Sequence, residues 1–220
     1  LVPGKEGDAT GITAYDAALV LQHVAGLGIL TVYPAAAADV NDSGSIGTMD
    51  ASYILQKAVG LIEVPFPGTA SVWEFDPPFR SYVDLPTDQT GQDFTGILLC
   101  DPSGNWGSGV SSSELMVQQS MAKLSIQGAQ PDPNGYVTAT IHLDPAGAQI
   151  YSLDLILNYD PVQAQIVSVK SGPLLEKWMI AKNVQQPGEI RVSLASAQPV
   201  ADQGIVLTLV FKMDGAPSAN

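Results

Sequence analysis

The chain has 220 residues, of which 45% are hydrophobic and 14% are charged, so it can bury apolar cores and is long enough for two domains. Twenty-two acidic residues against nine basic ones give a formal net charge of −13. Most of such a surface would repel a phosphate backbone, and we therefore expect no nucleic-acid partner.

A single cysteine, Cys100, rules out an internal disulfide framework, and the spacings typical of zinc sites are absent. We expect Cys100 to be a small buried apolar residue. The first residue is Leu1 and no basic-then-apolar leader follows it, so we expect a processed protein or an excised fragment. The uncharged run at 17–38 has a helical pattern interrupted by glycine and proline, which predicts a buried helix and no membrane span.

An internal repeat lies near the start of the chain. "YDAALVLQHVAGL" at 15–27 aligns with "MDASYILQKAVGL" at 49–61, at an offset of 34 residues that superposes Asp16 on Asp50. Apolar residues recur in each copy at helical spacing, and glycine stands where each helix should end. The repeat predicts two short helices that face each other, each preceded by a polar loop. A tetratricopeptide array has the same period, but its aromatic and proline signature is absent.

The loop before the second helix, "DVNDSGSIGTMD" at 39–50, has the spacing of a calcium loop. Calcium prefers oxygen ligands, and a twelve-residue loop supplies them from positions 1, 3, 5, 7, 9 and 12. Counting from the first residue places these positions at Asp39, Asn41, Ser43, the Ser45 carbonyl, Gly47 (open to water) and Asp50, with Gly44 at the sharp turn. The alternative is a polar turn that caps the helix at Thr48. The preceding "TVYPAAAA" predicts no incoming helix.

The repeat, this loop and the Leu-Gln pair of each helix resemble a type I dockerin over roughly residues 5–63. The resemblance implies two loop–helix segments that each bind calcium and a helix surface that contacts a cohesin. Metal positions in the second segment would be Asp39, Asn41, Ser43, Ser45 and Asp50. The first segment, "EGDATGITAYD", keeps Asp8, Thr10 and Asp16, but it places Lys5 at the first ligand position and one residue is missing before Gly11.

The same resemblance implies partner-recognition positions on both helices. They fall on Ala14, Tyr15 and Gln22 in the first copy, and on Thr48, Met49 and Gln56 in the second. Alternatively Tyr15, Met49 and the neighbouring leucines, Leu21 and Leu55, are core residues. For the leucines we favour the core.

Residues 67–116 are dense in Pro, Gly, Ser and Thr but also carry aromatic residues, which disordered segments lack. We expect an ordered, irregular bridge with two strands. Within it, "LLCDPSGNW" at 98–106 places Asp101, Ser103 and Asn105 at alternating positions, like the opening of another calcium loop. No helical pattern and no closing acid follow it, so a turn is the simpler interpretation, and a shared ligand role for Asp101 is the alternative.

The last hundred residues alternate between apolar and polar side chains, as in "VTATIHL" at 137–143 and "IRVSL" at 190–194. Turn signals separate these runs, which predicts an antiparallel β-sandwich over 117–215 with a tail at 216–220. "LNYDP" at 157–161 and "GEIRVSLAS" at 188–196 make this region resemble a cohesin, a jelly-roll sandwich. That resemblance implies a flat sheet face that binds a dockerin.

We therefore expect an α plus β multidomain protein with a dockerin-like module at 1–66 and a cohesin-like sandwich. Its expected role is a noncatalytic scaffold or adaptor, extracellular or on a cell surface, that uses calcium and serves a polysaccharide-handling assembly. The expected partners are cohesin-like or dockerin-like modules, including its own two modules with each other, and polysaccharide. No nucleophile motif accompanies His23 or His142, so we expect no enzyme. The alternative is a carbohydrate-binding module that stacks sugars on exposed aromatic residues: Trp73, Trp106, Tyr136 or Trp178.

Overall fold

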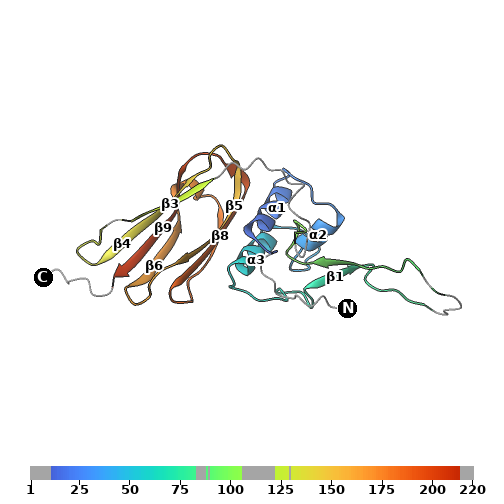
Figure 1. Cartoon of the computed structure of the whole chain (residues 1–220). Coiled ribbons are helices and arrows are strands. Elements are labelled where there is room, and N and C mark those ends of the chain that lie inside the picture. Colours follow the sequence, from blue (N-terminus) through green and yellow to red (C-terminus); the bar gives the residue numbers. More distant parts are fainter. Residues whose placement is uncertain (1–10, 83–87, 89, 106–121, 129, 214–220) are drawn as a thin grey trace.

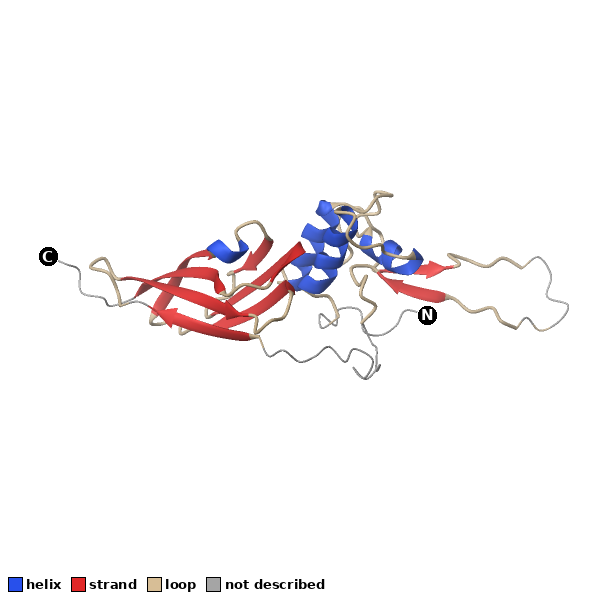
Figure 2. Ribbon diagram, turned by 90° about the horizontal axis from the view of Figure 1, so that it is seen from above, coloured by secondary structure: helices blue, strands red, loops and turns tan. Residues whose placement is uncertain are grey.

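The computed structural model describes residues 11–82, 88, 90–105, 122–128 and 130–213. Three helices lie between a β-sandwich and a small two-stranded sheet in both views (Figure 1, Figure 2). The helices are α1 (Ala14–Val24), α2 (Val32–Ala38) and α3 (Thr48–Ala58), and none in the described part of the chain is long and apolar enough to cross a membrane. The helices thus form a middle layer that contacts β-structure on two sides.

Helices α1 and α3 are the two predicted repeats. Each has an aspartate, Asp16 or Asp50, in its first turn that accepts the N–H of the residue just before the helix. Each is followed by a glycine with a positive φ, +70° at Gly26 and +72° at Gly60, which is the conformation that ends a helix. The prediction of two short facing helices is confirmed.

Helix α2 corrects the expectation that no helix precedes the polar loop at 39–50. Four consecutive alanines follow Pro34, and alanine has the highest helix propensity. Pro34 lies in the first turn, where its missing N–H is not needed for an intrahelical hydrogen bond. The loop at 39–50 therefore connects two helices.

The bridge contains two antiparallel strands, β1 (Trp73–Asp76) and β2 (Thr95–Leu98), as predicted. Residues 83–87, 89 and 106–116 of the bridge lie outside the described residues. Directly after β2, Leu99 and Cys100 are buried in the same apolar cluster as α1 and α3. The prediction that Cys100 is a buried apolar residue is confirmed, and this segment contributes to the helical core.

The sandwich consists of two antiparallel sheets, ordered β3-β4-β9-β6 and β5-β8-β7. Their strands are β3 (Lys123–Gly128), β4 (Tyr136–Asp144), β5 (Ile150–Asn158), β6 (Ala164–Ser171), β7 (Met179–Asn183), β8 (Glu189–Val200) and β9 (Gly204–Met213), with a 3₁₀ turn η1 (Pro173–Leu175). Alternate residues such as Ile141, Leu194 and Leu207 are buried between the sheets. The predicted alternation is therefore the sandwich core.

The corner between β6 and η1 depends on Gly172. A Cβ atom added there would lie 2.2 Å from the Ile205 carbonyl oxygen on β9, whereas a Cβ at Gly128 would meet no atom within 4 Å. We predict that Gly172→Ala destabilises the chain by about 1–3 kcal/mol, as forced overpacking does. Gly128→Ala is the control and should leave the melting temperature nearly unchanged. Circular dichroism measures the melting temperatures, and equal values for Gly172→Ala and the unmodified chain would contradict this close packing.

Candidate functional site

Helices α1 and α3 pack against part of the outer face of the sheet β5-β8-β7 (Figure 1, Figure 2), while Ile156 on the same face remains 61% exposed. Strand pairing places Asp154, Ser193 and Ala181 in one row across this face. Ala181 and Ala195 belong to the same apolar cluster as the helices. Because these side chains are small, the helices can lie close to the sheet. The chain's own helices thus occupy part of this face.

The contact fixes one end of each helix. On α1, the Ala14 N–H donates to Asp154 Oδ2 at 2.9 Å, and the Ser193 hydroxyl donates to the other oxygen of the same carboxylate. Beyond the end of α3, the side-chain amide of Asn183 donates to the Val59 and Gly60 carbonyls at 3.0 and 3.2 Å. A carboxylate meets the positive end of α1, and an N–H donor meets carbonyl groups at the negative end of α3. The sheet therefore matches the partial charges at the two helix ends as well as the shape of the helices.

The predicted partner-recognition positions are divided between this contact and the solvent. Ala14 is fully buried and donates to the sheet. Tyr15 is 48% exposed and Met49 57% exposed, and Thr48 is exposed as well. Gln22 and Gln56 are half-buried. A core role for Tyr15 and Met49 is therefore wrong.

The favoured core role of the leucines agrees with the structure. Leu55 is buried, and Leu21 packs against the same cluster. Sequence reasoning missed Asp154 and Asn183, the two sheet residues that hold the helix ends. The available signal for Asp154 was an acidic residue within the otherwise apolar strand "YSLDLILNY".

The loop at 39–50 gathers oxygen atoms in the order that its spacing predicts. Asp39 accepts the Ser43 N–H at 3.0 Å and the Gly44 N–H at 2.8 Å, and Asn41 Oδ1 also accepts the Ser43 N–H at 3.0 Å. The Ser43 hydroxyl donates to the Ser45 carbonyl at 3.0 Å. Gly44 has a φ of +79°, which suits glycine at the sharp turn. The loop is folded back on itself.

Asp50 closes this loop from the first turn of α3. It is 1% exposed, and its Oδ2 accepts the Gly47 N–H at 2.8 Å, while its Oδ1 is buried without a hydrogen-bond partner. Burial, and then the nearby charge of Asp39, raise the pKa of Asp50. A buried, unpartnered carboxylate oxygen beside a second carboxylate is an arrangement that a hard cation would satisfy, so the donor set of the loop fits calcium.

Glu74 on β1 is a neighbour of the loop that the sequence did not indicate. Burial, followed by the charges of Asp42 and Asp39, raises the pKa of Glu74. Within the described residues, however, no three His, Cys, Asp or Glu side chains gather as a metal cluster. A cation in this loop would therefore depend on amide, hydroxyl and carbonyl oxygens as well as on carboxylates.

The first segment is only partly described, since Asp8 and Thr10 lie outside the described residues. Asp16 is fully buried, and its Oδ2 accepts the Thr13 N–H at 2.9 Å and the Thr13 hydroxyl at 3.0 Å. Its Oδ1 accepts the N–H of Ser103, which belongs to the turn after β2, at 3.1 Å. Burial raises the pKa of Asp16 to about 6. Asp16 therefore joins two segments that are far apart in the sequence.

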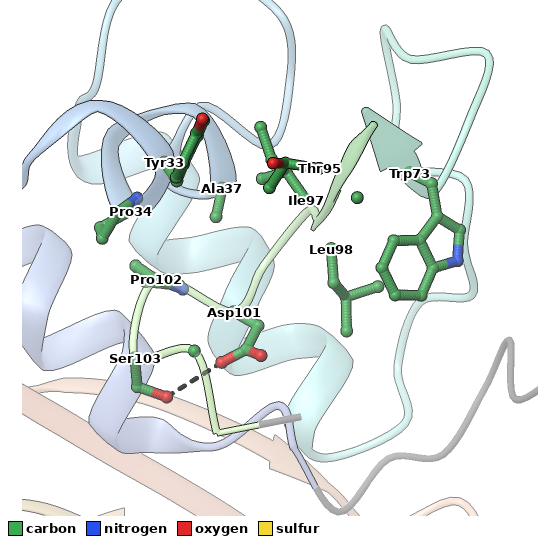
Figure 3. A pocket seen from close by; sticks show the side chains of 12 residues that line it. Tyr33, Pro34, Ala37, Trp73, Thr95, Ile97, Leu98, Asp101, Pro102 and Ser103 are labelled. Carbon is green, nitrogen blue, oxygen red and sulfur yellow. Dashed lines mark hydrogen bonds between the residues drawn. The ribbon is translucent and has the colours of Figure 1, made fainter. Parts of the chain in front are cut away.

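The turn that contacts Asp16 forms part of the wall of a cavity of about 430 Å³ (Figure 3). The Ser103 hydroxyl points at the Asp101 carboxylate, and Tyr33, Pro34 and Ala37 of α2 stand across the cavity. The remaining wall comes from β2 and from Trp73 on β1.

The aromatic residues considered for sugar stacking do not share one exposed face among the described residues. Trp73 is 8% exposed, and Trp178 packs against the sandwich core. Tyr136 is exposed, but Lys212 Nζ lies 4.7 Å from the centroid of its ring. Trp106 lies outside the described residues.

The two histidines hold local structure. His23 Nδ1 accepts the Leu30 N–H at 3.2 Å, which fixes the turn after α1. On β4, His142 Nε2 lies 3.1 Å from the Thr140 hydroxyl.

Comparison with known proteins identifies the sandwich. Residues 122–218 match the model of the Cohesin domain. The chain has no match among curated protein sequences.

Similar solved structures are cohesins. The sixth cohesin of scaffoldin B from Acetivibrio cellulolyticus, solved with a dockerin, is 19% identical, with a TM-score of 0.39 over 44% of this chain and 73% of that one. A non-cellulosomal cohesin from Archaeoglobus fulgidus is 19% identical, with a TM-score of 0.35 over 41% of this chain and 65% of that one. CaCohA2 from Clostridium acetobutylicum is 18% identical, with a TM-score of 0.37 over 42% of this chain and 64% of that one.

The expectation of a cohesin-like antiparallel sandwich is confirmed by the family match at 122–218, which covers the two sheets and does not include the three helices.

Proposed function

We propose that this chain is a noncatalytic adaptor that links proteins by docking a dockerin-like helical module onto a cohesin-like sheet. The observation that carries the proposal is the pair of contacts by which Asp154 and Asn183 hold the ends of α1 and α3 on the sheet β5-β8-β7. The Cohesin match over residues 122–218 supports it from the side of the sandwich. The partners would be dockerin-like or cohesin-like modules of an extracellular or cell-surface assembly that handles polysaccharides.

In this proposal the helical module pairs with the sandwich of its own chain. The same face would accept a dockerin-like module from another protein once its own helices leave it. The internal helical module and the external dockerin-like module would then compete for this face. The external module would bind only to the extent that its affinity for the face exceeds that of the internal module.

Calcium would hold the helical module in its docking shape. Asp39, Asn41, Ser43, the Ser45 carbonyl and Asp50 would bind one ion, and Asp16 would bind a second, together with Asp8 and Thr10 if the first segment acts as its counterpart does. The ion supplies positive charge and oxygen coordination. The chain supplies a folded loop between α2 and α3, so the free energy of binding would add to the stability of the helical layer.

We predict that Asp50→Asn removes most of the stabilisation that calcium gives to the helical layer. With calcium at about a hundred times its Kd, that stabilisation is about 2.7 kcal/mol in the unmodified chain. Asp42→Asn is the control, because Asp42 lies in the same loop at a position that is not a ligand. Calorimetry with calcium and with a chelator measures both, and identical transitions for the unmodified chain in the two conditions would contradict a calcium role.

We further predict that Ala14→Pro loosens the docking. Ala14 is the first residue of α1, where proline is tolerated, and Thr13 before it is already extended, so the change removes the N–H that donates to Asp154 and keeps the helix. Because Asp154 is exposed and water can replace part of the lost interaction, the change should destabilise the contact by about 0.5–1.5 kcal/mol. Thr48→Pro is the matched control at the equivalent, exposed position of α3. Equal effects of the two prolines on the unfolding of the helical layer would contradict the proposed docking contact.

The adaptor function itself is tested on the Ala14→Pro chain, because its sheet face keeps Asp154 and Asn183. A panel of calcium-loaded dockerins is passed over the immobilised variant and over the unmodified chain. We expect at least one dockerin to bind the variant more tightly, since the internal helices compete less. If neither chain binds a dockerin and both retain a soluble glucan, the adaptor proposal fails and carbohydrate binding replaces it.

A further inference from the structure

The turn at 101–105 and the loop at 39–50 present the same arrangement to the two repeated helices. Asp16 and Asp50 are equivalent residues of the repeat, and both are buried. Each has an Oδ2 that accepts the N–H three residues earlier, from Thr13 at 2.9 Å and from Gly47 at 2.8 Å. The two closing carboxylates are thus held in the same way.

A polar turn faces the other side of each closing carboxylate. At the second helix this is the segment that starts at Asp39, and its third residue is Asn41. At the first helix it is the segment that starts at Asp101, and the N–H of its third residue, Ser103, donates to Asp16 Oδ1. Asn41 and Ser103 thus hold the same position in the two turns, counted from the aspartate that starts each.

The internal hydrogen bonds of the two turns also correspond. Asp39 Oδ1 accepts the N–H of Ser43, four residues later, at 3.0 Å, and Asp101 Oδ1 accepts the N–H of Asn105, four residues later, at 3.2 Å. The turns start side by side, because the Cys100 N–H donates to the Ala37 carbonyl at 2.8 Å. Asp101, Ser103 and Asn105 therefore stand where Asp39, Asn41 and Ser43 stand in the other loop.

This correspondence accounts for the missing oxygen ligand in the first segment. Its own sequence places Lys5 at the first ligand position, and a lysine cannot supply an oxygen ligand. The turn at 101–105 lacks a closing acid in its own sequence, and Asp16 provides one from the first helix. The turn at 101–105 thus has the opening positions of a calcium loop, and the first helix has the closing acid.

We infer that Asp101, Ser103 and Asn105 complete the first calcium site in place of the chain before Asp16, so that one ion is bound by two segments far apart in the sequence. The inference rests on the proposed calcium binding and names the residues of its first site. The cavity beside the turn gives an ion a route to Asp101 (Figure 3).

Calcium titration of the full, chelator-treated chain by calorimetry tests the inference. We expect two binding events in the unmodified chain. Asp101→Asn should weaken one of them about tenfold or more, since the charge of the ligand set tunes calcium affinity, and should leave the event that Asp50→Asn removes. Asp132→Asn is the control, because Asp132 accepts the N–H of Asn134 and Tyr136 in a similar turn on the sandwich. Ser103→Ala, which keeps the backbone N–H to Asp16, is a second probe if Asp101→Asn does not fold.

The possible outcomes separate the two proposals. One event, lost in Asp50→Asn and unchanged in Asp101→Asn, overturns the shared site and leaves the calcium loop at 39–50 intact. Two events that respond to Asp8→Ala and not to Asp101→Asn assign the first site to the segment before Asp16 and also overturn the inference. No calcium binding by the unmodified chain overturns both proposals.

Discussion

The helical layer cannot enclose a core by itself, and this constraint organises the rest of the molecule. Two eleven-residue helices and one of seven residues have too little apolar surface to exclude water on every side. The sandwich supplies one wall through Ala181 and Ala195, and the segment after β2 supplies another through Leu99 and Cys100. Both surfaces therefore contribute to the stability of the layer, so its docking on the sheet is coupled to its folding.

This arrangement buries two carboxylates, those of Asp16 and Asp50. Asp16 and Asp50 satisfy N–H groups at the starts of α1 and α3, but the same burial raises the pKa of both. Asp154 has a different role, since it lies on the sheet and meets the N-terminus of α1 from outside the helical layer. The proposed calcium ions would compensate the first two carboxylates, whereas the helix end itself compensates the third. The proposed metal binding would thereby be connected to docking through helix α1, which carries Asp16 and Ala14.

The local features of this fold could be predicted from sequence, because their causes are local. Helical spacing with a closing glycine identified α1 and α3, and alternation identified the sandwich strands. Helix α2 was missed because Pro34 was weighed against the helix, although a proline in the first turn does not oppose it. The long-range contacts had no such signal. Ala14 meets Asp154 across 140 residues of sequence, and Asp16 meets Ser103 across 87, so neither the docking contact nor the closing partner of the turn at 101–105 could be predicted from spacing.

The central claim is that the helices of this chain are docked on its own sheet through their ends. Amide hydrogen exchange of Ala14, followed by NMR in the full chain, measures this contact most directly. The first N–H of a helix has no intrahelical partner, so it exchanges quickly unless something outside the helix accepts it. The structure predicts a protected Ala14 amide whose protection is lost in Asp154→Ala, while the equivalent amide of Thr48 exchanges quickly in both chains. Fast exchange of Ala14 in the unmodified chain, at the rate of Thr48, would contradict the docked arrangement.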